Sequence, residues 1–443
     1  MLKSVSLSLK WGKLGLSFKN NYKWITSTND GCINLKGQLL ELGVLGIKFG
    51  QFLYSNKEII SHDQLHIFES FLSDNSVHSK EETYKMIQLS DDSNFTKNNT
   101  ITIDNNILGS GSLAQTHICY LNNDTTRKYV LKVAHPNILD LKNEIVVLKY
   151  LIKTVSYFSQ INIDWESFFK NIETQIDFNN ESDNMKIFYE IYKNYEKIEV
   201  PQLIHGDRYY IVMTFCEGVQ LNLVDVKSEK YFSAVRLIAS SFLHTSYKYF
   251  ITHGDLHKGN ILVKPNGHIA LLDFGLCNNL MNEKTKTNET NELLYIYHNF
   301  FYTLDYKNTD KLFNSLFIFN EKYDKSILIK NFIKKISLAE KPKDKKNIQE
   351  VTAFKINLVK GLIKFSYKNN LKIKENLINL ITQLFIMESL IQTPYYNGTV
   401  LFRTLSHMKK DDFFKNEMSE YILKFHELEY NNEIDEVVKK RYA

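Results

Sequence analysis

The segment THGDLHKGNILV at residues 252–263 places metal-binding and acid–base side chains within a few residues of one another. Asp255 and Asn260 lie five residues apart, and Asp273 follows thirteen residues later as the first residue of DFG. Amide and carboxylate oxygens are ligands that Mg²⁺ prefers, and a further carboxylate can orient a hydroxyl group and accept its proton. The pattern H-x-D-x-x-x-x-N followed by DFG therefore predicts phosphoryl transfer. Asp255 is the candidate catalytic residue, and Asn260 and Asp273 are the candidate metal ligands.

The stretch NILVKPNGHIALLDFG consists of two apolar runs joined by turn residues at 265–267, which is a β-hairpin signal. Folding back of this hairpin would bring Asn260 and Asp273 side by side at its open end, with Asp255 one short turn away. A polar turn followed by an unrelated DFG is the alternative. Both spacings would then have to arise by accident on a strand–turn–strand background.

A site of this kind also needs groups that hold nucleotide phosphates. Lys132 lies in the strand-like run YVLKV and is predicted to contact the phosphates. Upstream, LGSGSLAQTH predicts a turn between two strands, in which Gly109 and Gly111 let the backbone approach phosphate. With Ser110 and Ser112 they form a candidate phosphate loop, although the segment does not match GxGxxG.

Lys132 requires a carboxylate partner from a helix, and two residues compete for that position. Glu144 follows the lysine at the distance expected of a simple kinase helix. Glu181 lies in QIDFNNESDN, which is unusually dense in Asp, Glu and Asn. The sequence pattern alone does not decide between them.

The order of predicted elements along the chain is helices, a small β-rich region, one strand and a large helical region. Helical spacing covers 33–90 and a polar boundary 90–100, and β-type runs fill 101–133. Further helices are predicted at 138–158, 165–195 and 233–250 and throughout the chain beyond Asn282, and a strand ends at Cys216. This predicts an α+β, two-lobed protein-kinase-like fold with helices added in front. The expected divisions are a basic segment at 1–32, a helical extension at 33–99, an N-lobe at 100–216, a C-lobe at 217–400 and a helical tail at 401–443.

Composition narrows the class of protein and its compartment. The chain has 55 Lys and Arg against 50 Asp and Glu, a net charge of +5 without the concentrated basic stripe of a nucleic-acid-binding protein. Four scattered cysteines without a CxxC pair indicate a reducing compartment. No apolar run reaches the length of a membrane span. The first acidic residue is Asp30, and the lysine- and serine-containing segment before it predicts either an organellar, such as mitochondrial, presequence or a plain amphipathic helix.

Together these residues resemble the UbiB/ADCK family of atypical kinase-like proteins over about residues 40–400. The resemblance rests on the family's KxGQ helix, alanine-rich loop, lysine strand with a following His-Pro, E-x-D run, hinge strand and HGDxHxGN with DFG. In this chain these are LGVLGIKFGQFLYSNKEII, LGSGSLAQTHICYL, YVLKVAHPNI, QIDFNNESDN, VMTFCEGVQL and HGDLHKGNILV with LLDFG.

The resemblance implies that Glu181 is the partner of Lys132 and that Lys48 and Gln51 of KFGQ reach the nucleotide pocket. It also implies that Glu217, in the hinge segment, contributes to nucleotide binding and that Asp177 belongs to the polar cluster.

This chain departs from the family pattern in two places. Gln175 replaces the first acid of the E-x-D run, and if that acid pairs the KxGQ lysine in the family, Lys48 keeps only a neutral hydrogen-bond acceptor here. The loop has Ser110-Gly111 where alanine is typical of the family. Because of these two substitutions, the gating of activity that is usual in the family is not expected to apply unchanged to this chain.

The resemblance implies an atypical kinase or ATPase that binds ATP and Mg²⁺ and contacts membrane surfaces, lipids or quinone-pathway components. The chain has no APE-like end to an activation segment, which disfavours a peptide substrate. Two alternatives remain, a nucleotide-binding scaffold with negligible turnover and a small-molecule kinase of the choline or aminoglycoside type. The KFGQ segment argues against the latter. The sequence does not identify the phosphoryl acceptor, the oligomeric state or the compartment.

Overall fold

The structure is a computed structural model of the 443-residue chain. It describes residues 9–14, 17, 24, 27–55, 62–72, 77–90, 94–156, 165–279, 313–314, 316–318, 324–337, 361–362, 364–366, 368–369, 371–373, 404 and 407–419. The described chain divides into two compact units. Unit 1 comprises Met1–Ile191 and Pro201–Phe215, and unit 2 comprises Tyr192–Val200 and Cys216–Ala443.

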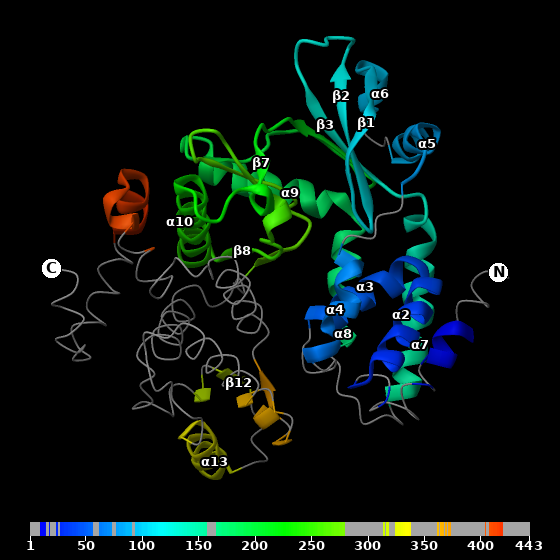
Figure 1. The fold of residues 1–443 in the computed structure, drawn as a ribbon, viewed down its shortest axis with the longest axis vertical. Helices are drawn as coiled ribbons and strands as arrows, with labels where there is room; N and C mark the ends of the chain where they lie inside the picture. Colours follow the sequence, from blue (N-terminus) through cyan, green and yellow to red (C-terminus); the bar gives the residue numbers. More distant parts are fainter. Residues whose placement is uncertain are drawn as a thin grey trace. The chain divides into compact units, whose positions relative to one another are not determined.

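Unit 1 contains a five-stranded antiparallel sheet with the order β1-β2-β3-β6-β5 (Figure 1). Its strands are β1 (Ile101–Ser110), β2 (Ala114–Leu121), β3 (Tyr129–Ala134), β5 (Leu203–Gly206) and β6 (Tyr210–Thr214). Asn122 and Asn123 follow β2 with φ values of 55° and 61°, a left-handed conformation that asparagine tolerates in tight turns. The β-type runs predicted over 101–133 are therefore confirmed, and the sheet presents Lys132 on its central strand β3.

Helices of unit 1 precede the sheet and continue after β3. They are α2 (Asn29–Glu41), α3 (Gly43–Ser55), η1 (His62–Gln64), α4 (Leu65–Phe68), η2 (Glu69–Leu72), α5 (Lys80–Ser90), α6 (Phe95–Asn98), α7 (Ile138–Ser156), α8 (Trp165–Gln175) and α9 (Phe178–Tyr192). The helix α5 packs against β3 and β6. The Thr28 hydroxyl accepts a hydrogen bond from the Gly31 N–H, so α2 begins before the predicted boundary at 33.

Glycines in α3 allow close packing of the KFGQ segment. A Cβ atom at Gly46 would overlap the backbone of Leu39 in α2, and one at Gly50 would overlap the ring of Phe71 in η2. The indole of Trp11 packs edge-on against Phe49, with ring centroids 6.1 Å apart. The helical spacing predicted here is thus confirmed, and its glycines mark the points of helix contact.

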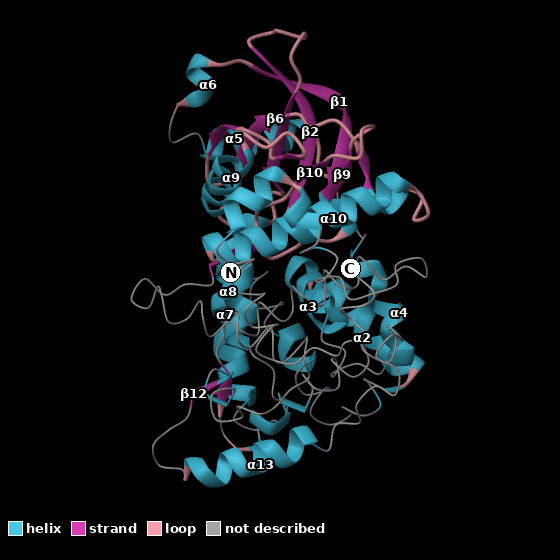
Figure 2. Ribbon diagram, turned by 90° about the vertical axis from the view of Figure 1, so that its left-hand side faces the viewer, coloured by secondary structure: helices cyan, strands magenta, loops and turns pink. Residues whose placement is uncertain are grey.

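Unit 2 contains a four-stranded sheet of order β4-β10-β9-β7 and a pair formed by β8 and β11. These strands are β4 (Ile198–Glu199), β7 (Val219–Gln220), β8 (Ile251–His253), β9 (Ile261–Val263), β10 (Ile269–Leu271) and β11 (Cys277–Asn279). The helix α10 (Glu229–His244) packs against β9 and β10, below which it runs in Figure 2. Ser228 caps α10 by accepting from Tyr231 N–H, and for this reason the helix begins before the predicted start at 233.

Short elements complete unit 2 and correct two predictions. They are η3 (Leu221–Leu223), the π-helical turn η4 (Thr245–Tyr249), η5 (Lys258–Asn260), β12 (Phe317–Ile318), α13 (Lys325–Ser337) and β13 (Lys372–Ile373). The prediction of helix throughout the chain beyond Asn282 is wrong for β12 and β13, which pair antiparallel. No strand was predicted between DFG and Asn282, but β11 lies there and pairs with β8. Residues 280–312 lie outside the described residues.

Candidate active site

The predicted site residues divide between the two units. Unit 1 contributes the candidate phosphate loop, Lys132, Glu181 and the KFGQ residues, and unit 2 contributes Glu217, Asp255, Asn260 and Asp273. The local geometry within each unit shows how these side chains are held.

Lys132 on β3 forms an ion pair with Glu181 on α9. Its Nζ atom lies 2.7 Å from one carboxylate oxygen of Glu181 and 2.8 Å from the other. The lysine side chain is 12% exposed and the glutamate side chain 5% exposed. Of the two carboxylates that the sequence pattern left open, Glu181 is therefore the one placed against Lys132, while Glu144 lies on α7.

The start of α9 supports this ion pair. Asp177 precedes the helix, and its carboxylate accepts a hydrogen bond from Asn179 N–H at 3.2 Å. Glu181 lies in the first turn of α9, where the helix dipole stabilises a carboxylate. Phe178 lies beneath Lys132, with the ammonium nitrogen 5.7 Å from the ring centroid. Asp177 thus acts on the pair through the helix that carries Glu181.

The candidate phosphate loop is a tight turn between β1 and β2. Gly111 N–H donates to Ala114 O at 2.8 Å, which closes the turn. Thr116 Oγ1 donates to Gly109 O at 3.1 Å, and Gly109 itself pairs with Thr116 in the β1–β2 ladder. The backbone of the turn that joins β1 to β2 is therefore fixed by hydrogen bonds.

The KFGQ side chains contact neighbouring helices of unit 1. Lys48 Nζ donates to Gln175 Oε1 at 2.7 Å, which joins α3 to the last residue of α8. Gln51 Nε2 donates to Phe71 O at 2.8 Å. The neutral side chain at 175 is thus in direct contact with the KFGQ lysine.

In unit 2, Asn260 lies against Asp255. Asn260 Nδ2 donates to Asp255 O at 2.9 Å and lies 3.5 Å from Asp255 Oδ2. The His257 ring accepts from Gly259 N–H at 3.0 Å and closes η5, the turn that brings the two residues together. Asn260 is buried at the start of β9, and the Asp255 side chain is 40% exposed.

The predicted hairpin forms and places DFG beside Asn260. Ile261 pairs with Leu271 at its open end, and Leu272 N–H donates to Asn260 O at 2.9 Å. Asp273 follows with a φ of 57°, and Gly275 N–H lies 3.3 Å from its Oδ1. Left-handed backbone at a non-glycine residue is costly and concentrates at functional sites. The hairpin thus brings the backbone of the predicted metal ligands together as expected.

His253 contacts both the turn that carries Asp255 and the backbone just before DFG. Its Nε2 donates to Leu272 O at 2.9 Å, and its Nδ1 accepts from Asp255 N–H at 3.3 Å. The Phe274 ring centroid lies 5.1 Å from that of His253. Burial lowers the pKa of His253, which favours the neutral ring that these two contacts require. His253 therefore fixes both Asp255 and the DFG backbone.

Glu217 is exposed in the segment before β7.

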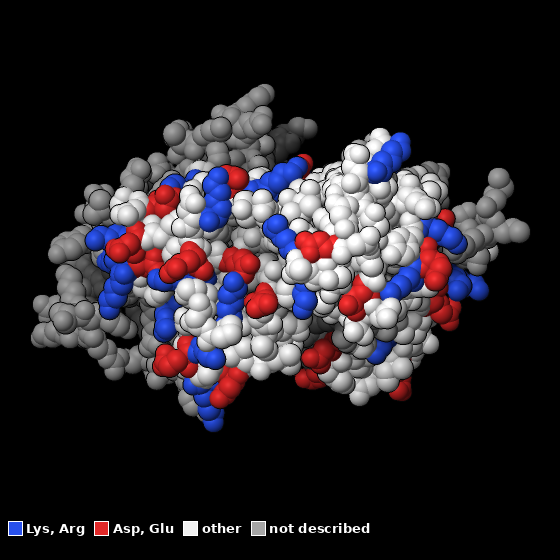
Figure 3. Space-filling view, turned by 90° about the horizontal axis from the view of Figure 1, so that it is seen from above, with Lys and Arg blue, Asp and Glu red and all other residues white. Residues whose placement is uncertain are grey.

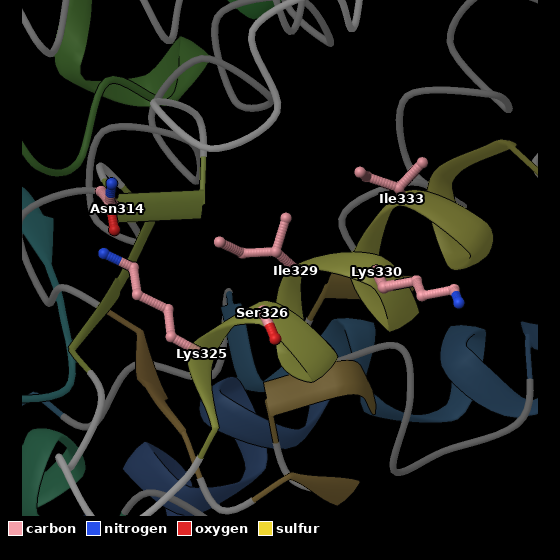
Figure 4. Close-up of a pocket in the computed structure, with 6 residues that line it drawn as sticks. All are labelled: Asn314, Lys325, Ser326, Ile329, Lys330 and Ile333. Atoms are coloured by element: carbon pink, nitrogen blue, oxygen red, sulfur yellow. The ribbon is translucent and has the colours of Figure 1, made fainter.

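A separate hollow of about 580 Å³ lies on α13 and is lined by Asn314, Lys325, Ser326, Ile329, Lys330 and Ile333 (Figure 4). It contains none of the predicted site residues. Lys and Arg are interspersed with Asp and Glu on the face drawn in Figure 3. Among the described helices, none combines the length and the apolar character of a membrane-spanning segment.

Comparison with protein families identifies the domain. The family model described as ABC1 atypical kinase-like domain matches residues 74–310, which is more than half of the chain. An AarF domain-containing protein kinase 1 of Gallus gallus is 27% identical over 190 residues, covering 40% of this chain and 36% of that protein. An uncharacterized aarF domain-containing protein kinase of Arabidopsis thaliana, described as chloroplastic, is 24% identical over 253 residues, covering 55% and 35%. The aligned part is thus about a third of the length of these relatives.

Comparison with solved structures finds partial similarity to two proteins. An erythromycin complex of a Mycobacterium tuberculosis protein is 13% identical, covers 71% of this chain and 83% of that one, and has a TM-score of 0.45. A Rio2 kinase from Chaetomium thermophilum with ADP, Mg²⁺ and phosphoaspartate is 15% identical, covers 50% and 63%, and has a TM-score of 0.30. With the family match and the element order above, the kinase-like fold class is confirmed.

Proposed function

The chain belongs to the ABC1 atypical kinase-like family, and on that premise we propose that it binds Mg·ATP and transfers or hydrolyses the terminal phosphate. Family membership supports a kinase-like phosphotransferase in general. Nucleotide, metal and turnover are our inference from the residues described above.

The residues at the proposed metal site fit a hard cation. Because Asn260 Nδ2 donates to Asp255, the amide oxygen Oδ1 points away from that contact. Among the residues that the structure describes, no donor pairs with Asn260 Oδ1. An amide oxygen without a donor beside an aspartate suits Mg²⁺. Asn260 and Asp273 would hold the ion, which when bound neutralises charge on phosphate oxygens.

The remaining roles follow from position and charge. Lys132 would hold the phosphates, with Glu181 fixing the direction of its ammonium group. Asp255 would orient the acceptor or water and take its proton. The turn residues Gly109, Ser110, Gly111 and Ser112 would contact phosphate through the backbone, and Lys48, Gln51 and Glu217 would contribute to nucleotide binding.

The observation that carries this proposal is the Lys132–Glu181 pair. An ammonium group that is largely buried, 2.7 and 2.8 Å from the two carboxylate oxygens, is costly to desolvate, and such pairs contribute little net stability. A pair that joins the sheet to α9 and is retained at that cost is better explained by a requirement for a positioned cation. A lysine that binds nucleotide phosphates in a kinase-like site would meet that requirement.

The acceptor we propose is water or a small-molecule or lipid component, such as one of the quinone pathway, rather than a peptide. The missing APE-like end of an activation segment supports this choice. An organellar setting is also part of the proposal, because Arabidopsis relatives are named chloroplastic. Microscopy of the tagged full chain in its own cells tests that setting, and a purely cytosolic signal would contradict it.

Mg²⁺-dependent ATP hydrolysis by the wild type and by Asp273→Asn, with and without anionic vesicles, tests the activity. We expect turnover only in the wild type and only with Mg²⁺. Equal hydrolysis by both proteins would refute an active enzyme. Nucleotide-dependent thermal stabilisation without turnover would instead indicate the scaffold function.

A further inference from the structure

Buried polar side chains lie behind the candidate phosphate turn in unit 1. His78 is 9% exposed, and Gln115, His117 and His135 are 0%, 1% and 2% exposed. They come from the segment before α5, from β2 and from the end of β3. Buried polar networks are costly unless satisfied. The roles assigned above use none of these side chains.

His135 contacts the turn at two points. Its ring Nε2 lies 2.9 Å from Gly111 O, and its backbone N–H donates to Leu113 O at 2.9 Å. The same ring nitrogen lies 3.4 Å from Ser110 Oγ. His135 therefore donates hydrogen bonds to two carbonyl groups of the turn, those of Gly111 and Leu113.

These contacts fix the tautomer of each ring. A carbonyl oxygen only accepts, so His135 Nε2 carries the hydrogen and its neutral Nδ1 must accept. His78 Nδ1 lies 2.7 Å from that Nδ1 and must donate. His78 Nε2 then carries no hydrogen and lies 3.0 Å from Thr83 Oγ1 on α5, a hydroxyl that also lies 3.2 Å from Ser79 O. Hydrogen bonds thus run in one direction from the His78 ring through the His135 ring to the turn.

The surroundings hold both rings neutral and His78 in place. Burial lowers the pKa of His78 to about 4, and the neighbouring His135 ring lowers it further. Burial also lowers the pKa of His135. Gln115 binds the His78 backbone through both of its amide atoms, accepting from N–H at 3.0 Å and donating to O at 3.1 Å. Gln115 itself pairs with Ser110 across the β1–β2 ladder.

The turn leaves backbone donors available. The N–H groups of Ser112 and Leu113 have no acceptor in the part of the chain that the structure describes. An anion-binding turn must present N–H groups and direct its carbonyl oxygens elsewhere, because their negative ends repel phosphate. Binding of the Gly111 and Leu113 carbonyls by His135 meets that condition.

We propose that His135, held in one tautomer by His78, is a positioning residue that orients the Gly111 turn for nucleotide phosphate. This inference rests on the proposed function and adds a specific requirement to it. His135 acts on the phosphate through the turn, and His78 acts through His135.

Matched substitutions at both positions separate this role from packing. His135→Leu removes the donor to Gly111, and His135→Gln keeps an N–H at the position of Nε2. His78→Leu removes the donor to His135, and His78→Asn keeps an N–H at the position of Nδ1. Calorimetry then gives the Kd of each variant for ADP and for adenosine, and circular dichroism checks the fold.

Loss of one hydrogen bond predicts about tenfold weaker ADP binding in both leucine variants. Adenosine binding should change less than twofold, and the amide variants should recover most of the ADP affinity. Equal weakening for ADP and adenosine would show general damage and overturn the positioning role. Unchanged ADP binding in folded His135→Leu would overturn it as well.

Two controls keep this inference separate from the proposed function. ADP binding by the wild type, lost in Lys132→Met, establishes the nucleotide site; its absence refutes the proposed function. If a leucine variant does not fold, nitrogen NMR of histidine-labelled wild type reads the tautomers directly. Hydrogen on Nε2 of His135 and on Nδ1 of His78 supports the proposed hydrogen bonds from His78 through His135 to the turn, and any other assignment refutes them.

Discussion

Lys48 on α3 donates a hydrogen bond to the neutral side chain of Gln175 at the end of α8, with 2.7 Å between Nζ and Oε1. An acid at position 175 would make this contact an ion pair. The lysine already makes this hydrogen bond charge-assisted, and a carboxylate acceptor would add the attraction between two opposite charges. This chain therefore holds its KFGQ helix to α8 with a contact that a single substitution can strengthen.

Substitution of Gln175 by glutamate should stabilise unit 1. We expect a gain of about 1 kcal/mol, because a charged acceptor replaces a neutral one at a half-buried position. For a unit of this size the midpoint of thermal unfolding should rise by roughly 2–4 °C. Gln175→Met is the matched control, since it keeps the length but removes the acceptor, and it should lower the midpoint. A glutamate variant no more stable than the methionine variant would contradict the contact.

Disruption of the Lys132–Glu181 pair should destabilise the fold and abolish nucleotide binding. Lys132→Met leaves Glu181 buried without its cation, which costs about 3–5 kcal/mol in comparable pairs. The double variant Lys132→Met/Glu181→Leu should be more stable than Lys132→Met, because no charge remains buried. Chemical denaturation measures the stabilities, and a double variant less stable than both single variants would contradict this account. Neither variant should bind ATP.

The sequence predicts those parts of the site that depend on local spacing. The hairpin between Asn260 and Asp273 follows from alternating apolar runs around a Pro-Asn-Gly turn, and the pairing of Ile261 with Leu271 confirms it. The choice between Glu144 and Glu181 did not follow from pattern, because periodicity shows which face of a helix is apolar but not which helix packs on β3. Family resemblance supplied that choice.

The parts that pattern missed depend on contacts distant in sequence. His78 and His135 are 57 residues apart, and isolated histidines have no signature of pairing. The only signal was the His-Pro after the lysine strand. The strands β12 and β13 have two residues each, too few for an alternating pattern. The start of α10 could have been predicted from Ser228, which caps the helix three residues before Tyr231. The prediction used apolar periodicity alone, and a polar cap is not part of that pattern.

The stability of unit 1 should fall as the pH drops from about 6.5 towards 4. Burial lowers the pKa of His78 from 6.5 to about 4, so in this range the unfolded chain binds a proton that the folded chain excludes. Above pH 6.5 the neutral His78 ring leaves the free energy of unfolding at its full value. By pH 4 the protonation of His78 in the unfolded chain lowers the free energy of unfolding by about 2–3 kcal/mol. His135 and His117 face His78 and lower its pKa, whereas Glu82 opposes them.

Unfolding midpoints of the wild type and His78→Asn between pH 4 and 7 measure this effect. Because asparagine does not titrate, the variant should lose part of the pH dependence, although other buried histidines retain theirs. His66→Gln, at an exposed position, is the control and should follow the wild type. Parallel curves for the wild type and His78→Asn would mean that His78 is not held neutral.

Gly254 allows the backbone after DFG to lie directly against the turn that carries Asp255, the proposed catalytic residue. Gly254 N–H donates to Leu276 O, and a Cβ atom at this position would overlap that carbonyl oxygen. Gly254→Ala should therefore displace either Asp255 or DFG and reduce ATP turnover at least 100-fold, since displacements near 1 Å have effects of that size. The unfolding midpoint should fall by only a few degrees.

Gly37→Ala is the matched control for this prediction, because a Cβ atom at Gly37 meets nothing within 4 Å. Gly37 lies inside α2, where alanine is favoured over glycine by roughly 0.5–1 kcal/mol. This variant should keep full turnover and unfold at a slightly higher temperature. Normal turnover in Gly254→Ala would show that the close approach of Leu276 is not required to position the proposed catalytic residues.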